Sequence, residues 1–239
     1  MRGDYLSIVN VQELVDAGFH FGHRTSRWNP KMKPFIFGKR NLIHIINLRE
    51  TLKGLITACK FLTNLARTKK DILFVGTKWQ ARDITVQEAK RCGMHYVSER
   101  WLGGTLTNFD TIRKQLLRLV ELENLEKTGG INQFSKKAIS SLNRERKKLV
   151  TNLEGIRHMS ALPGALVVVD PKHELNAIKE ARKLGIPTVC LADTDCDPDL
   201  IDICVPGNDD AIRSISLFLT KTTDAILAAK ELSATIHKL

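Results

Sequence analysis

The chain has 239 residues, of which 43% are apolar and 26% are charged. This length and apolar content suit one large α/β domain with a core and exclude wholesale disorder. No apolar run approaches the roughly 18 residues of a membrane span. The N-terminal stretch MRGDYLSIVNVQEL lacks the apolar block of a secretory signal, so we expect neither a membrane anchor nor export.

Basic and acidic residues are separated along the chain, whose formal net charge is +11. Seven basic residues and no acidic one lie between Asp16 and Glu50. Seven aspartates and no basic residue lie between Lys183 and Arg213. This polarity is typical of a protein with one face on a polyanion, and we expect the acidic run to face protein partners or solvent.

The five cysteines are odd in number and include no C-x-x-C pair. A zinc ribbon or a redox pair is therefore not supported, and we expect buried, reduced thiols.

The first elements are a short helix and a basic arm. Asn10, with Glu13 three residues later, forms a capping-box pattern for a helix that ends at Gly18. The arm covers about residues 19–41 and mixes cations with aromatic rings such as Trp28. Cations for phosphates beside rings for bases are typical of a nucleic-acid docking arm. The alternative is a solvated charged loop whose aromatic residues form a local core.

Apolar strands then alternate with amphipathic helices. Strands are predicted at 42–47, 71–78, 94–100, 165–170, 187–193 and 203–207, and helices at 48–70, 79–93, 171–185 and 208–232. We expect Asp170 to be the N-cap and Pro171 the first residue of the third of these helices. The alternation predicts an α/β fold with a doubly wound, mainly parallel sheet that is covered on both faces.

Residues 108–153 interrupt this alternation. Two segments with apolar residues three and four apart are separated by a turn at GGINQ, which predicts an inserted antiparallel α-helical hairpin of coiled-coil type. The expected domains are therefore an α/β domain from residues 1–107 and 154–239, and a helical hairpin over 108–153. The hairpin should project, because two such helices bury little surface by themselves.

The residues that could carry chemistry are few. VGTK ends a strand before a helix, where doubly wound folds bind phosphate, but neither Gly-rich nucleotide-binding motif is present. His20 and His23 lack further ligands nearby in the sequence. Asp193 and Asp209 are both predicted at strand ends on one edge of the sheet and could hold a structural divalent cation, although solvated acids or helix caps are the commoner outcome. No nucleophile elbow or activated cysteine is present, so we expect no enzyme and no other cofactor.

Seven ordered blocks resemble a known family. They are HFGHRTSRWNPKMKPFIFGKRN, HIINL, ILFVGTK, RWLGGTLTN, GIRHMSALPGALVVVD, GIPTVCLADTDCDPD and VPGNDDAIRSI. Together they resemble the bacterial and organellar family of the second small-subunit ribosomal protein, from about Val11 to the last helix.

The resemblance implies a flavodoxin-like sheet that serves as a scaffold on the ribosome. Family members bind small-subunit ribosomal RNA (rRNA) at the junction of head and body. They also contact other small-subunit proteins, including the large messenger-binding one where it exists. The implied location is the ribosome of the bacterial cytoplasm or of an organellar stroma or matrix, with no membrane contact and no homo-oligomer.

With this resemblance, the basic residues become predicted rRNA contacts. The predicted set is Arg24, Arg27, Trp28, Lys31, Lys33, Lys39, Arg40, Lys78, Arg100, Trp101, Asn108, Arg144, Arg146, Lys147 and Lys148. Trp28 and Trp101 would stack or wedge, with a core role as the alternative. Recognition should be mainly of backbone and shape.

Two other functions stay open from the sequence. One is a nucleotide- or sugar-phosphate-binding enzyme on the same architecture, which predicts a ligand pocket at VGTK. The other is a protein-interaction scaffold, which the basic second arm of the hairpin argues against.

Overall fold

The computed structural model describes residues 10–130 and 134–236, with side chains described up to residue 232. The expected turn between the two hairpin helices includes residues 131–133, and the N-terminal stretch includes residues 1–9; both lie outside the described part.

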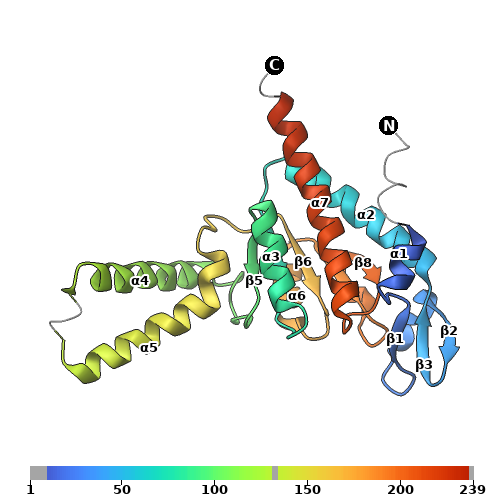
Figure 1. Ribbon diagram of the computed structural model, residues 1–239, viewed down its shortest axis with the longest axis horizontal. Coiled ribbons are helices and arrows are strands. Elements are labelled where there is room, and N and C mark those ends of the chain that lie inside the picture. The colour runs from blue at the N-terminus through green and yellow to red at the C-terminus, as the bar shows by residue number, and fades with distance from the viewer. Residues whose placement is uncertain (1–9, 131–133, 237–239) are drawn as a thin grey trace.

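A five-stranded parallel sheet forms the centre of the molecule (Figure 1). Its strands are β4 (Ile72–Val75), β5 (His95–Val97), β6 (Ala165–Val169), β7 (Thr188–Ala192) and β8 (Ile203–Pro206). Their order is β5-β4-β6-β7-β8, and every neighbouring pair is parallel. Counted along this sheet, the order is 2-1-3-4-5, which is that of doubly wound flavodoxin-like sheets. The predicted α/β class with a parallel sheet is confirmed.

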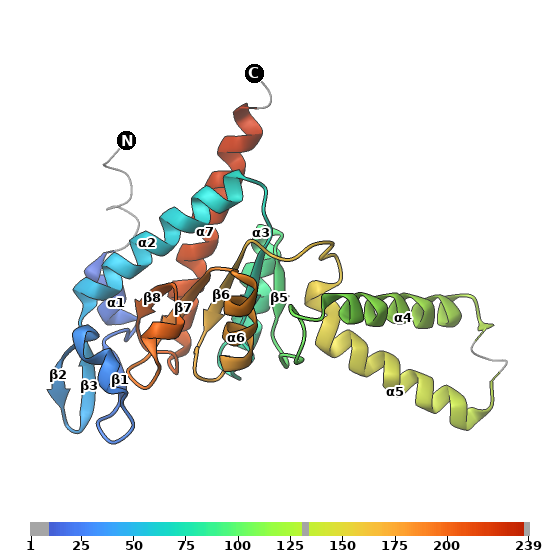
Figure 2. The ribbon, with the colours of Figure 1, turned by 180° about the vertical axis from the view of Figure 1, so that it is seen from behind.

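Helices cover both faces of this sheet (Figures 1 and 2). They are α2 (Leu48–Arg67), α3 (Arg82–Cys92), α6 (Leu175–Leu184) and α7 (Ile212–Ile236). Alternate residues of a strand point to opposite faces. Thus Phe74 packs in the core under α2, α3 and α7, while its neighbours Leu73 and Val75 pack in the core under α6. Burial on both faces explains the continuous apolar strand sequences.

Helices α3, α6 and α7 begin three or four residues later than predicted, at Arg82, Leu175 and Ile212. Helix α6 begins at Leu175 rather than at Pro171. Asp170 has a left-handed φ of 60°, and its Oδ1 accepts a hydrogen bond from the His173 amide at 3.0 Å. The carboxylate therefore closes a turn ahead of the helix instead of capping it.

The N-terminal region forms a second, smaller sheet beside β8. Helix α1 (Val11–Asp16) precedes it, and the Asn10 side chain accepts a hydrogen bond from the Gln12 amide as expected of an N-cap. Strands β1 (Phe21–Arg24), β2 (Ile36–Arg40) and β3 (Ile43–Ile46) pair antiparallel in the order β1-β3-β2. The basic arm is thus a folded sheet, with a short 3₁₀ helix, η1 (Pro30–Phe35), between β1 and β2.

Helices α4 (Phe109–Lys127) and α5 (Lys136–Leu153) follow β5 and project from the body (Figures 1 and 2). Ile112 and Leu116 near the start of α4, and Leu153 at the end of α5, belong to the core under α6. Ion pairs Arg118–Glu145 at 3.1 Å and Arg146–Glu126 at 2.9 Å join the two helices. A short 3₁₀ helix, η3 (Glu154–Ile156), leads back toward β6, and another, η4 (Pro198–Leu200), precedes β8.

All five cysteines are free thiols, and four of them are buried. Burial raises the pKa of Cys59 to about 12, so this thiol stays protonated at neutral pH. Among the described residues, no helix is long and apolar enough to cross a membrane.

Candidate nucleic-acid interface

The basic arm presents six exposed cations: Arg24, Arg27, Lys31, Lys33, Lys39 and Arg40. Apart from Lys31, none of them has an ion-pair partner among the described residues. Because a paired cation has already lost much of its attraction for phosphate, the other five are better placed for a polyanion than Lys31. The structure thus brings together a third of the predicted contact set on one small sheet.

Lys31 differs from the other cations of the arm. Its ammonium lies 2.8 Å from Asp197 and 2.7 Å from Asp199, two residues of the loop before β8. The amide of Asn29 also donates to the Thr194 carbonyl at 2.8 Å. Lys31 therefore holds the arm against the acidic loop, and its predicted phosphate contact would compete with two carboxylates.

We predicted that the acidic run faces protein partners or solvent, and Asp199, Asp202 and Asp210 are exposed. The run also has a role within the chain. Each of its seven aspartates has a partner within the chain. These pairs are Asp193–His23, Asp195–Lys172, Asp197–Lys31, Asp199–Lys31, Asp202–Thr188, Asp209–Lys78 and Asp210–Lys78. The acidic loops compensate charge inside the protein, since the chain folds the arm back onto them.

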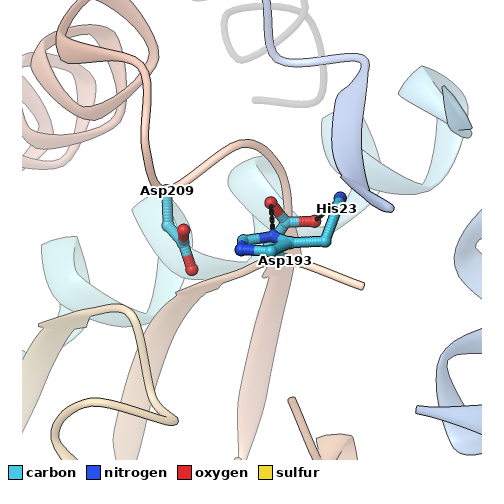
Figure 3. A group of neighbouring side chains, drawn as sticks. All are labelled: His23, Asp193 and Asp209. Atoms are coloured by element: carbon cyan, nitrogen blue, oxygen red, sulfur yellow. Dashed lines mark hydrogen bonds and ion pairs between the residues drawn. The ribbon is translucent and has the colours of Figure 1, made fainter. Parts of the chain in front are cut away.

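A cluster of charges lies where the arm meets the carboxyl edge of the main sheet (Figure 3). His23, of β1, contacts Asp193 at the end of β7, with 2.7 Å between Nδ1 and Oδ2. Its backbone amide donates to Asp193 Oδ1 at 3.1 Å. Gly22 permits this approach, because a Cβ there would meet Thr194 at 2.7 Å. Asp209 follows β8 and is 1% exposed.

Lys78 completes the cluster from the end of β4. Its Nζ lies 2.7 Å from Asp209, 2.7 Å from Asp210 and 3.1 Å from Asp170. The Lys78 side chain is only 14% exposed. Three carboxylates thus neutralise the ammonium that the sequence had suggested as an RNA contact.

Negative charge is in excess here, since four carboxylates share one lysine and one histidine. The hydrogen bond from Asp193 raises the pKa of His23 to about 9, although burial lowers it. Burial and the neighbouring Asp170 raise the pKa of Asp209 to about 8, although Lys78 lowers it. Burial lowers the pKa of Lys78, but the surrounding carboxylates outweigh it and raise that pKa overall. All three shifts show a site that binds positive charge.

The end of β4 does not offer a free phosphate cradle. The Thr77 amide and hydroxyl both donate to Glu174, at 2.8 and 2.5 Å. Burial raises the pKa of Glu174 and outweighs these two hydrogen bonds, which lower it, so the pKa lies above its usual range. The donors that a nucleotide phosphate needs at this edge are already bonded to a carboxylate.

The loop between β5 and α4 is organised by one glutamate. Glu180, on α6, accepts hydrogen bonds from Trp101 Nε1 and from the amides of Gly104, Leu106 and Thr107, over distances of 2.8–3.1 Å. Gly104 has a φ of +89°, a conformation that other residues rarely adopt. Burial raises the pKa of Glu180, but these hydrogen bonds outweigh it, and the pKa lies below its usual range.

The predicted contacts in this loop have different environments. Trp101 is 9% exposed and packs in the core under α6, which is the alternative role foreseen for it. Arg100 and Asn108 are exposed at the two ends of the loop. Only these two can meet a docked partner without a rearrangement.

The basic residues of α5 lie far from the arm, on the projecting helix pair (Figure 1). Arg144, Lys147 and Lys148 are exposed, while Arg146 is half-buried and paired with Glu126. They form a second positive region that the structure keeps apart from the first.

The sequence did not single out Glu174 or Glu180. Glu174 directly precedes α6 and Glu180 lies within it, and the partners of both are about 70–100 residues away in the chain. No local signal identifies such a residue. The HFGH and ADTD blocks contain His23 and Asp193, but only the fold places them together.

Fold and surface together define a class: a basic α/β scaffold with exposed cations on a small antiparallel sheet and on a projecting helix pair. The family model for ribosomal protein S2 matches residues 14–229. The chain therefore belongs to the ribosomal protein S2 family, and the resemblance seen in the sequence is confirmed.

Curated relatives are similar in sequence to this chain along most of their length. The small ribosomal subunit protein uS2 of Rhodopirellula baltica is 56% identical over 220 residues, covering 92% of this chain and 85% of the relative. The uS2 protein of Endomicrobium trichonymphae is 53% identical over 224 residues, covering 94% and 92%. That of Syntrophobacter fumaroxidans is 53% identical over 220 residues, covering 92% and 80%. Since these relatives are ribosomal proteins and not enzymes, the expectation of a non-enzymatic protein is confirmed.

Proposed function

We propose that this protein is a structural constituent of the small ribosomal subunit that binds rRNA through its folded basic arm. The observation that carries the proposal is the group of five exposed cations on β1–β3 and the segments between them, none of which is in an ion pair with another described residue. Phosphate contacts of this kind supply affinity and position, and they do not require a base-reading set.

The same proposal extends to finer features. Helices α4 and α5 would act as an inserted coiled-coil hairpin, domain 108–153, whose basic residues give a second RNA face. The body would sit at the junction of head and body of the subunit and hold neighbouring proteins, including the large messenger-binding one where present. The location would be the bacterial cytoplasm or an organellar stroma or matrix. Family membership and the separation of the two basic regions support these features.

The test removes four charges from the arm. The variant Arg24→Ala, Arg27→Ala, Lys33→Ala and Lys39→Ala should incorporate more weakly into small subunits prepared without this protein. The salt dependence of incorporation should flatten by about 0.7–0.9 logarithmic slope units for each phosphate that the variant no longer binds. Sedimentation of subunits over a range of salt concentrations measures both effects.

A matched variant removes four exposed lysines elsewhere: Lys53, Lys69, Lys179 and Lys183. Its net charge falls by the same amount, and it should keep the slope of the wild type. Equal slopes in all three proteins would refute the role assigned to the arm.

A structural divalent cation is a second proposal for the charge cluster. Ligand atoms of His23, Asp193 and Asp209 lie within 4.8 Å of one another, and the carboxylate excess favours a cation. One imidazole with two carboxylates suits Zn²⁺ better than Mg²⁺, which prefers oxygen ligands alone. The ion would hold the arm on the sheet edge and would share Asp209 with Lys78.

Metal addition tests this site. Zn²⁺ at about 100 times its dissociation constant should add about 2.7 kcal/mol to the free energy of unfolding and raise the melting temperature. Asp193→Asn should remove the shift, while the exposed control Asp110→Asn should keep it. A shift of equal size in the Asp193→Asn protein would identify non-specific binding and exclude this site.

A further inference from the structure

A small cavity lies within the basic arm, away from the charge cluster. Its volume is about 240 Å³, and it is lined by Trp28, Lys33, Ile36, Gly38, Lys39 and His44. A Cβ at Gly38 would meet no atom within 4 Å, so the space beside this glycine is open. All six lining residues lie in the segment from β1 to β3, and Lys33 and Lys39 among them are exposed.

One wall of the cavity is aromatic. The half-buried Trp28 ring lies against His44 with ring centroids 5.1 Å apart and tilted by 45°. Trp28 lies in the segment before η1, and this segment is fixed to the main domain by a hydrogen bond from the Asn29 amide to the Thr194 carbonyl. An indole fixed at the side of an open cavity is a stacking surface for a flat ring.

His44 has unused hydrogen-bonding capacity. It lies on the central strand β3 and is 8% exposed, yet neither ring nitrogen has a hydrogen-bond partner among the described residues. A neutral imidazole carries one donor and one acceptor. Because unpartnered polar groups are costly in an interior, a ligand edge with donors and acceptors would be bound favourably after a small rotation of the ring.

Two cations stand at the same cavity. Lys39 is directly opposite His44 in the β2–β3 pairing, so both side chains leave the sheet on the same face. Lys33 enters from η1. Both lysines are exposed, and neither is in an ion pair within the described part of the chain. Their ammonium groups are available to an anion at the mouth.

We infer that this cavity takes a single unstacked nucleotide of the rRNA. Its base would lie against Trp28 and meet His44, and its phosphate would bind Lys33 and Lys39. A cavity of this size admits one base and excludes a helical stem, and the two lysines favour a nucleotide over an uncharged ring. The inference rests on the proposed function, because it names the part of the RNA that the arm would bind.

The experiment probes the rRNA of assembled small subunits at single-nucleotide resolution, using dimethyl sulfate and 2′-hydroxyl acylation. Subunits would carry the wild type, Trp28→Ala, Trp28→Phe, or the control Trp79→Ala, whose ring is 77% exposed on the main domain. One nucleotide protected by the wild type and by Trp28→Phe should become reactive with Trp28→Ala. Protection of neighbouring backbone positions, and all protection by Trp79→Ala, should be unchanged.

Incorporation of Trp28→Ala in competition with the wild type should be about ten-fold weaker, the typical effect of losing one stacked base. Ultraviolet cross-linking of wild-type subunits gives a second measurement that needs no substitution. It should yield a nucleotide adduct on the peptide that contains Trp28 or on the one that contains His44.

The outcomes separate the two proposals. Wild-type protein that fails to sediment with small subunits would overturn the proposed function itself. Wild-type protein that sediments with the subunit, but whose adducts lie only on other peptides, would overturn the nucleotide cavity and leave the scaffold function standing. The same conclusion follows if folded Trp28→Ala exposes no nucleotide.

Discussion

Replacing Lys78 with methionine should lower the free energy of unfolding by about 3–5 kcal/mol near pH 8.5, the usual cost of removing one partner from a buried charge pair. Lys78 is 14% exposed and faces Asp170, Asp209 and Asp210. Without it, these carboxylates repel one another in a poorly hydrated site. Urea denaturation in the presence of a chelator measures the loss without interference from metal.

The loss of unfolding free energy should be smaller near pH 6, because Asp209 is then protonated in the wild type and in the variant. The pKa of Asp209 is about 8 in the folded protein, above its unfolded value, so the folded state binds the extra proton. Stability from this group therefore falls as pH rises toward 8. In the variant the carboxylate keeps its proton to a higher pH, so the penalty is largest where the wild-type carboxylate has ionised.

Lys53→Met is the matched control. Lys53 is 72% exposed and pairs with Glu50 one helical turn away, and such surface pairs contribute about 0–1 kcal/mol. A Lys78→Met effect as small as that of the control, or one that does not grow with pH, would contradict the buried-charge account.

Glu180→Ala should destabilise the protein by about 2–4 kcal/mol, since hydrogen bonds to a charged group contribute about 1.5–3 kcal/mol each and several share this carboxylate. The amides of Gly104, Leu106 and Thr107 lose their acceptor, so their hydrogen exchange should accelerate. The loop that carries Arg100 and Asn108 should lose its fixed shape. Urea denaturation measures the loss of unfolding free energy, and hydrogen exchange of the backbone amides measures the loosening of the loop.

Glu180→Gln isolates the contribution of the charge. The folded-state pKa of Glu180 is lowered, so its stabilisation is fully present above the unfolded pKa and is lost as pH falls through the folded value. The wild type and the glutamine variant should therefore converge in stability in acid. The control Glu121→Ala, 63% exposed on α4, should change neither stability nor loop exchange. Faster exchange over the whole molecule would indicate a global effect and not a loop-specific one.

The cations of the basic arm have different roles, which depend on the residues that the fold brings next to each of them. They made the arm a candidate RNA surface, and five of them are indeed exposed and unpaired among the residues that the structure describes. Lys31 and His23 belong to the same basic stretch, yet they bind the acidic loops instead. The sequence alone does not distinguish one cation of the arm from another. In the fold, Lys31 binds a nearby carboxylate, whereas the five cations without such a partner among the described residues face solvent.

The sequence by itself determined the α/β class, the parallel sheet and the helices over 109–127 and 136–153, because strand and helix periods are local properties of the chain. Its ordered blocks also determined the family. The tertiary structure alone decided that the arm folds as a sheet, that the aspartates compensate charge within the chain, and that Glu180 organises a distant loop. It also brought Trp28, His44 and two lysines around one cavity. These features depend on contacts between residues far apart in the chain, which only the closed fold brings within hydrogen-bonding distance.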